Sequence, residues 1–121
     1  MPSMNGKRRW LIPDGYMGTA SSGEFVCHEA VCVLNLSDAD AHIELTLYFE
    51  DREPMRGFHA TCARERTHHI RLDRLTNDDG QSIPRLTPYA VLVESDTDIV
   101  VQASRLDVSQ PDFSLMTTIA Y

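Results

Sequence analysis

Residues 42–50 alternate between polar and apolar side chains, and this alternation constrains the fold more than any other feature of the chain. The apolar positions are Ile43, Leu45, Leu47 and Phe49, and the intervening positions are His42, Glu44, Thr46, Tyr48 and Glu50. Successive side chains of a β-strand point to opposite faces, so the pattern predicts a strand with one buried face. A helix would need apolar residues every three or four positions, and hardly any segment has that spacing.

A second expected strand, over residues 25–36, precedes this one and is apolar on both faces. Ala30, Cys32 and Leu34 would lie on one face, and the valines at positions 31 and 33 on the other. Strands with two apolar faces are typical of central positions in covered sheets. An acidic turn over residues 37–40 would join the two strands into a hairpin.

The rest of the chain predicts six further strands separated by turns. They are expected over residues 9–12, 56–62, 66–72, 89–94, 99–106 and 113–121. Residues 13–15 (Pro-Asp-Gly) would end the first strand, and residues 17–23 would form a flexible loop. Residues 73–88 would make a long excursion with one helical turn, and residues 95–98 would be the turn of a hairpin.

About eight short strands at this spacing are typical of an antiparallel β-sandwich of jelly-roll type. The chain has 121 residues, 42% of them hydrophobic, which is enough for one core. It has no composition break or linker, so residues 1–121 are expected to form a single all-β domain.

The charge balance is acidic, with 11 basic and 18 acidic residues and a net charge of −7. This charge opposes non-specific binding to nucleic acid and to anionic membrane surfaces. No run of 18 or more apolar residues is present, so membrane insertion is not expected. The three cysteines lie in strand-like segments and favour reduced, buried thiols. We therefore expect a cytoplasmic protein that does not bind nucleic acid.

Several motifs, spread in order along nearly the whole chain, carry a family resemblance. They are Trp10 ahead of Gly15-Tyr16, His28-Glu29 before an apolar strand ending in Leu34-Asn35, Arg66-Thr67-His68-His69-Ile70-Arg71, Gln102-x-x-Arg105-Leu106-Asp107 and Thr118-Ile119-Ala120-Tyr121. With these motifs the chain resembles the sensory rhodopsin transducers. The resemblance implies a cytoplasmic β-sandwich that forms homo-oligomers, typically tetramers. One branch of that family receives the signal of a membrane photoreceptor, and many relatives are suggested to bind small molecules, among them sugars.

His28 and Glu29 are the first candidate ligand-binding residues. As neighbours on a strand they point to opposite faces, so they cannot act side by side as an acid and a base. One of them would line a pocket at the end of the strand. Alternatively, each would bond to an adjacent loop.

Gln102, Arg105 and Asp107 are further candidates, because they interrupt an otherwise apolar strand. Arg105 and Asp107 lie two residues apart on one face and are expected to pair, which would offset the cost of burying charge. Such a pair would be structural, would lie in a subunit interface, or would orient a polyol or carboxylate. Trp10 and Tyr16 flank a turn, where an aromatic ring would stack on a sugar or belong to the core.

Arg64, Arg66 and His68 concentrate positive charge in an acidic chain and would lie on one face of a strand. This basic strip is the candidate partner-binding surface. The alternative is a charged sheet edge that prevents aggregation.

Motifs for catalysis or cofactor binding are not evident. The chain has no Cys-x-x-Cys or His-x-His spacing, no Gly-x-Ser-x-Gly motif and no phosphate-binding loop. We therefore expect neither a metal nor a cofactor, and not an enzyme. The expected function is signalling through protein contact as a homo-oligomer; the alternative is binding of a small polar ligand unrelated to light sensing.

Overall fold

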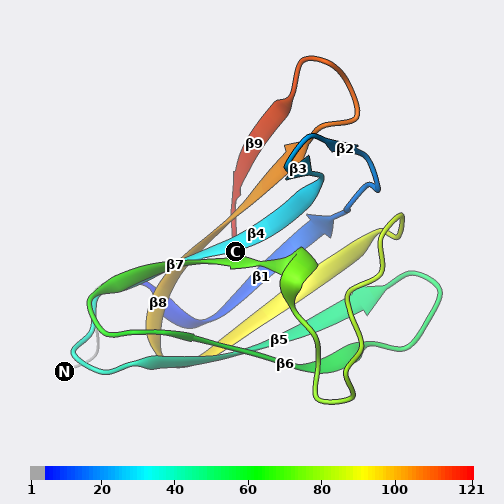
Figure 1. The fold of residues 1–121 in the computed structure, drawn as a ribbon. Coiled ribbons are helices and arrows are strands. Elements are labelled where there is room, and N and C mark those ends of the chain that lie inside the picture. Colours follow the sequence, from blue (N-terminus) through cyan, green and yellow to red (C-terminus); the bar gives the residue numbers. More distant parts are fainter. Residues whose placement is uncertain (1–4) are drawn as a thin grey trace.

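The computed structural model describes residues 5–121, which form antiparallel strands and one short 3-10 helix (Figure 1). The strands are β1 (Lys7–Gly15), β2 (Ser21–Ser22), β3 (Phe25–Val26), β4 (His28–Asn35), β5 (Ala41–Phe49), β6 (Met55–Cys62), β7 (Arg66–Arg71), β8 (Tyr89–Asp107) and β9 (Ser114–Ile119), and the 3-10 helix is η1 (Leu72–Arg74). The expected all-β, antiparallel class is confirmed.

Strand β8 belongs to two layers and organises the whole domain. Its first half pairs with β5 on one side and β1 on the other, and β5 also pairs with β6. Its second half pairs with β4 and β9, and β4 also pairs with β7. Figure 1 shows β8 running beside β5, bending, and continuing beside β4.

Two hairpins expected from the sequence are wrong for the same reason. Residues 95–98 are not a turn, because β8 is one continuous strand through them. Strands β4 and β5 do not pair with each other; they lie in different layers, on the two halves of β8. The polar residues that resemble a turn lie where β8 leaves one layer for the other, and there Asp96 accepts hydrogen bonds from His42.

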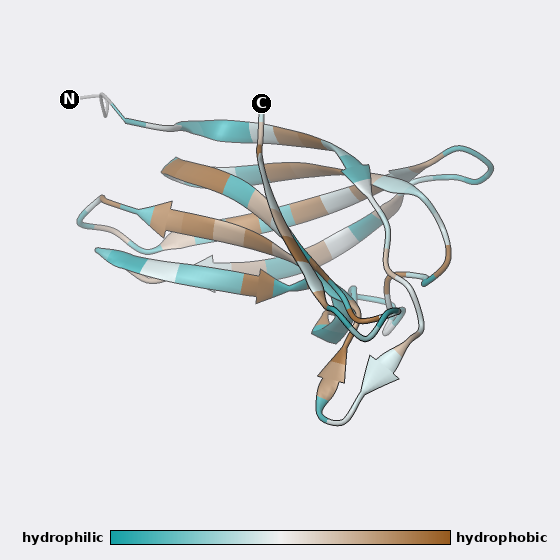
Figure 2. Ribbon diagram, turned by 90° about the horizontal axis from the view of Figure 1, so that it is seen from above, coloured by the Kyte–Doolittle hydropathy of each residue, from teal (hydrophilic) through white to brown (hydrophobic). Residues whose placement is uncertain are grey.

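The core lies between the two layers and is built from alternating positions, as the sequence predicts. Ile43, Leu45 and Leu47 of β5 are buried, as are Val31 and Val33 of β4. Figure 2 shows the corresponding alternation of hydrophobic and hydrophilic bands along the strands. Burying these side chains stabilises the fold by about 1.5–3 kcal/mol each, before the cost of ordering the chain.

Strand β4 is central, as expected, but only one of its faces is fully covered. Leu34, on the second face, is 40% exposed, and Cys32 is half-buried. The second face is covered less because no further layer of the described part of the chain packs over it. The expected strand over residues 25–36 is also interrupted at Cys27, where the small β2–β3 hairpin ends and β4 begins.

The N-terminal strand continues further than expected, through Pro13 to Gly15. Its register with β8 shifts between Ile12 and Gly15, which marks an irregularity where proline fits. Leu11 and Tyr121 exchange backbone hydrogen bonds, so the end of the chain ties β1 to the β9 side of the other layer.

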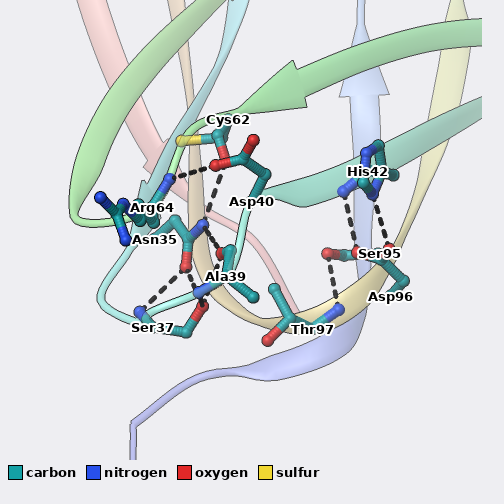
Figure 3. A network of polar contacts seen from close by, with 10 residues as sticks. All are labelled: Asn35, Ser37, Ala39, Asp40, His42, Cys62, Arg64, Ser95, Asp96 and Thr97. Atoms are coloured by element: carbon teal, nitrogen blue, oxygen red, sulfur yellow. Dashed lines mark hydrogen bonds and ion pairs between the residues drawn. The ribbon is translucent and has the colours of Figure 1, made fainter.

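A buried asparagine organises the connection between the two layers (Figure 3). The Asn35 amide donates to the carbonyl oxygens of Ala39, at 2.9 Å, and Cys62, at 3.0 Å, and its own oxygen accepts the backbone N–H of Ser37. It therefore links the β4–β5 connection to the end of β6. Among residues 5–121, the structure contains no helix with the length and apolarity of a transmembrane span.

Candidate functional site

Glu29 and Arg105 form the centre of the candidate site. They are direct cross-strand neighbours on β4 and β8, and Arg105 Nε donates to Glu29 Oε2 at 3.0 Å. Glu29 is only 5% exposed, and its other oxygen accepts the Tyr16 backbone N–H at 2.7 Å and the Tyr89 hydroxyl. A buried carboxylate is tolerated here because a cation and two further donors satisfy it.

The expected pairing of Arg105 with Asp107 is therefore wrong, and Glu29 takes that place. Directly opposed residues on neighbouring strands have Cβ atoms about 5 Å apart, whereas residues i and i+2 of one strand are about 6.6 Å apart. The Arg105 guanidinium therefore contacts Glu29, at 3.0 Å, and lies 3.7 Å from Asp14.

Two pKa values in this cluster are perturbed by burial and by Glu29. Burial raises the pKa of Tyr89, and the adjacent Glu29 carboxylate raises it further, so the phenol stays a hydrogen-bond donor. Burial alone would lower the pKa of Arg105, but the Glu29 carboxylate outweighs burial and the pKa is raised. The cluster is thus a fixed set of donors around one carboxylate.

A pocket of about 320 Å³ lies beside Arg105, at the end of β8. Its polar lining comes from Tyr16, Thr19, Cys27, Arg105, Asp107 and Ser109, and its apolar lining includes Ala20, Leu86 and Leu106. A smaller hollow on the other side of Arg105 is lined by Met116 and Thr118 of β9. Arg105 therefore stands between the pocket and strand β9.

Asp107 is the anionic side chain of the pocket lining. Its Oδ1 accepts the Ser109 backbone N–H at 2.8 Å and contacts the Cys27 thiol at 3.7 Å. The hydrogen bonds from Ser109 are the main reason why the pKa of Asp107 lies below its usual range. The pocket thus presents a carboxylate and a guanidinium two residues apart on one strand.

The long excursion before β8 holds the pocket wall in place. Arg85 Nη1 donates to the carbonyl oxygen of Cys27 at 2.7 Å and also to that of Gly18. Leu86, at a positive φ of 57°, donates its backbone N–H to Met17 at 2.8 Å. Sequence reasoning missed Cys27, Arg85 and Leu86 as site residues, and the one signal that could have indicated this loop is an arginine between Pro84 and Pro88.

The candidate ligand-binding residues from the sequence divide into two groups. Tyr16, Glu29, Arg105 and Asp107 lie at or directly behind the pocket. Three others, Trp10, His28 and Gln102, lie elsewhere.

Each of these three residues has a different setting. The Trp10 indole N–H donates to Ile99 at the bend of β8, far along that strand from Arg105. His28 faces away from Glu29 and bonds to the Val26 carbonyl oxygen. Gln102 is exposed in register with Cys32 on the outer face of β4 and β8.

The candidate partner-binding residues lie at the opposite end of β4 from the pocket. Arg66 pairs in register with Asn35, and His68 bonds to the Thr61 carbonyl oxygen at 2.8 Å. Arg64 precedes the strand and donates its backbone N–H to Asp40 (Figure 3). All three residues were expected on one face of a strand. Arg66 and His68 do lie on one face of β7, but Arg64 lies outside the strand.

A second, more open hollow of about 460 Å³ lies on the outer face of β5, β6 and β8. It contains a pair formed by His42 and Asp96, in which His42 Nδ1 lies 2.7 Å from Asp96 Oδ2. Hydrogen bonds from His42 hold the pKa of Asp96 below its usual range. Across residues 5–121, no group of three histidine, cysteine, aspartate or glutamate side chains is arranged to hold a metal ion.

Comparison with known proteins identifies the family. The family model of the Anabaena sensory rhodopsin transducer matches residues 5–121. The chain belongs to the Anabaena sensory rhodopsin transducer family. A crystal structure of Thermotoga maritima protein 1070 matches this member of the transducer family at 39% identity and a TM-score of 0.87, covering 98% of this chain and 96% of the other.

The structure of the Anabaena sensory rhodopsin transducer itself is also similar. It matches this family member at 39% identity and a TM-score of 0.75, with 85% of this chain and 90% of the other covered. A search of curated proteins found no match. The family resemblance inferred from the motifs is therefore confirmed.

Proposed function

We propose that this transducer-family protein is a cytoplasmic signalling protein that acts by contact with another protein, a microbial sensory rhodopsin in the membrane. The observation that carries the proposal is the family match over residues 5–121. The 39% identity to the Anabaena transducer supports the same partner class. We further propose that the protein acts by binding and not by catalysis.

We also propose a homo-oligomer, with a tetramer as the expected size. Strand β9 supports this, because it is an edge strand whose residues are all exposed and which carries no charged side chain. Its Leu115 and Ile119 are each 71% exposed, on the face that also presents Leu34 and Val100. Exposed apolar side chains on an unprotected edge are typical of protein contact sites.

The basic strip of Arg64, Arg66 and His68 is the proposed surface for the membrane partner. All three are exposed, and they lie away from β9, so both contacts fit on one protomer. The strip is positively charged although the protein as a whole carries a net charge of −7. An acidic loop of the partner would therefore be attracted to this strip and not to the rest of the surface.

Co-purification with a sensory rhodopsin encoded in the same genome tests this function. The triple variant Arg64→Ala/Arg66→Ala/His68→Ala is expected to lose the rhodopsin, whereas the control Arg56→Ala on β6 is expected to keep it. Failure of the wild-type protein to bind the rhodopsin would overturn the proposed partner. Equal binding by the triple variant would overturn the proposed surface.

The pocket favours a second function, the binding of a small polar ligand. A volume of about 320 Å³ lined by both charged and apolar side chains is the observation that supports it. A rise in melting temperature with a polar small molecule would test it, and no rise with any such compound would contradict it.

A further inference from the structure

Within residues 5–121, the ionic partners around the pocket leave one carboxylate without a contacting cation. Glu29 and Arg105 cancel each other at the pocket wall, and Asp14 adds a second carboxylate to Arg105. Asp107, by contrast, receives its hydrogen bonds from neutral groups, the Ser109 backbone and the Cys27 thiol. Arg105 is close enough to lower the pKa of Asp107 as a minor cause, but its ion pairs are with the other two carboxylates.

Arg85, in the loop that holds the pocket wall, has partners of its own. Arg85 uses its Nη1 for the backbone carbonyl oxygens of Cys27 and Gly18, and its Nη2 lies 4.0 Å from Asp73. Asp73 in turn takes two hydrogen bonds of 2.8 Å from Arg71. The pocket lining has one arginine and one carboxylate among its side chains. Arg105 forms its ion pairs with Glu29 and Asp14, so among residues 5–121 Asp107 is the charged group of the lining that contacts no cation within ion-pair distance.

We propose that the pocket binds a small molecule with a primary ammonium group next to a hydrogen-bond acceptor, with the ammonium on Asp107 and the acceptor on Arg105. This proposal rests on the second function proposed above. α-Amino acids and amino sugars share this chemistry.

The geometry of the two side chains suits such a ligand. Asp107 and Arg105 lie two residues apart on the same face of β8, about 6.6 Å along the strand. An ammonium offers up to three donors to the carboxylate, and a guanidinium retains free N–H groups after one bond to Glu29. Leu86 and Leu106 provide apolar contact for the carbon skeleton.

Other ligand types fit the charges less well. A carboxylate without an ammonium group would satisfy Arg105 but be repelled by Asp107. A neutral polyol would bond to both side chains but leave the carboxylate charge uncancelled in a partly buried site. The ammonium group is therefore what should distinguish a ligand from its analogues.

Isothermal titration of the full chain with matched compounds tests the proposal. L-Alanine and glucosamine are the two ammonium-bearing probes, and lactate and glucose are their counterparts without nitrogen. At least one ammonium probe is expected to bind at least tenfold more tightly than its counterpart. Which of the two binds distinguishes an amino acid from an amino sugar.

Two variants locate the site. Asp107→Asn keeps the shape of the side chain and is expected to lose at least tenfold in affinity for the ammonium probe. Asp38→Asn, on the exposed β4–β5 turn, removes the same charge far from the pocket and is expected to have no effect. The melting temperature without ligand shows whether each variant is folded.

The outcomes separate this proposal from the function on which it rests. Equal affinity for lactate or glucose, or unchanged binding by Asp107→Asn, would overturn the ammonium proposal while the pocket remains a ligand site. No binding of any of the four compounds at millimolar concentration would overturn the ammonium proposal. If a wider set of polar compounds also fails to raise the melting temperature, the ligand-binding function falls with it.

Discussion

At the scale of the residue, the most consequential side chain is Glu29. It connects β4 with β8 through Arg105, with the tyrosine at position 89 and with the backbone at Tyr16. Removing it would leave a guanidinium and a phenol without their partner in a buried setting. Its role is to hold the side chains behind the pocket in one arrangement.

We expect Glu29→Ala to lower the free energy of unfolding by about 3–5 kcal/mol, because it leaves the partly buried Arg105 charge without its closest partner. Urea denaturation followed by tryptophan fluorescence measures this. Glu24→Ala, on the exposed β2–β3 turn, is the control and should change stability by less than about 0.5 kcal/mol. A loss below about 1 kcal/mol in Glu29→Ala would contradict the structural role assigned to the cluster.

Asp73 makes stability depend on pH. Burial would raise the pKa of this carboxyl, but the hydrogen bonds and charge of Arg71 outweigh burial and lower the pKa below the ordinary value of 3.8. A lowered carboxyl pKa contributes stability that is present above the ordinary value and is lost as the pH falls through the folded-state pKa.

We therefore expect Asp73→Asn to cost about 1–3 kcal/mol at pH 7, the range for leaving a buried or charged partner unsatisfied. The difference from wild type should shrink as the pH falls below 3.8. Thermal unfolding at a series of pH values measures this difference. A difference that stays constant with pH would show that the Asp73 charge is not the cause.

At the scale of the element, β8 decides how the domain holds together. Its inward-facing residues keep the same alternation on both sides of the bend, as seen at Val91, Val93, Ile99 and Val101. A strand shared by two layers cannot open in one layer without disturbing the other. The β2–β3 hairpin, by contrast, pairs only with itself and is mostly exposed.

We expect amide hydrogens of β8 to exchange only on global unfolding, while those of β2 and β3 exchange by local opening. Hydrogen-exchange mass spectrometry resolves the two classes. If residues 89–95 exchanged much faster than residues 100–107, the two halves would open separately and β8 would not unite the layers.

At the scale of the whole molecule, the uncharged edge at β9 contrasts with the charged edge at β7. Strand β7 carries Arg66, Arg71 and two histidines, and charged edges resist pairing with other chains. Strand β9 lacks such protection, which is why it supports the proposed oligomer.

We expect Ile119→Lys to dissociate the oligomer without unfolding the protomer, because a charge on this face would be buried in the contact. Light scattering coupled to size-exclusion chromatography measures the mass. Thr61→Lys, exposed on β6, is the control and should leave the mass unchanged. An unchanged mass for Ile119→Lys would place the oligomer contact elsewhere.

Much of the local structure could be predicted from the sequence. The alternation from Ile43 to Phe49 and the central position of β4 follow from side-chain period, which is a property of neighbouring residues. The Ser95–Asp98 segment has the composition of a turn, although the buried odd-numbered positions of Val91 and Val93 resume in the same phase at Ile99 and Val101. Composition is a weaker guide than period where a strand bends between layers.

By itself, the sequence determined the period of the strands, the all-β class and the family. The period depends on neighbouring residues, and the family motifs can be read in order along the chain without knowing which residues contact one another. Only the tertiary structure decided that Glu29 pairs with Arg105, 76 positions away, and that Tyr16 and Asp107 join them while Trp10 does not. The physical reason is register: which residues oppose one another on paired strands depends on the packing of both layers, and no local pattern encodes it.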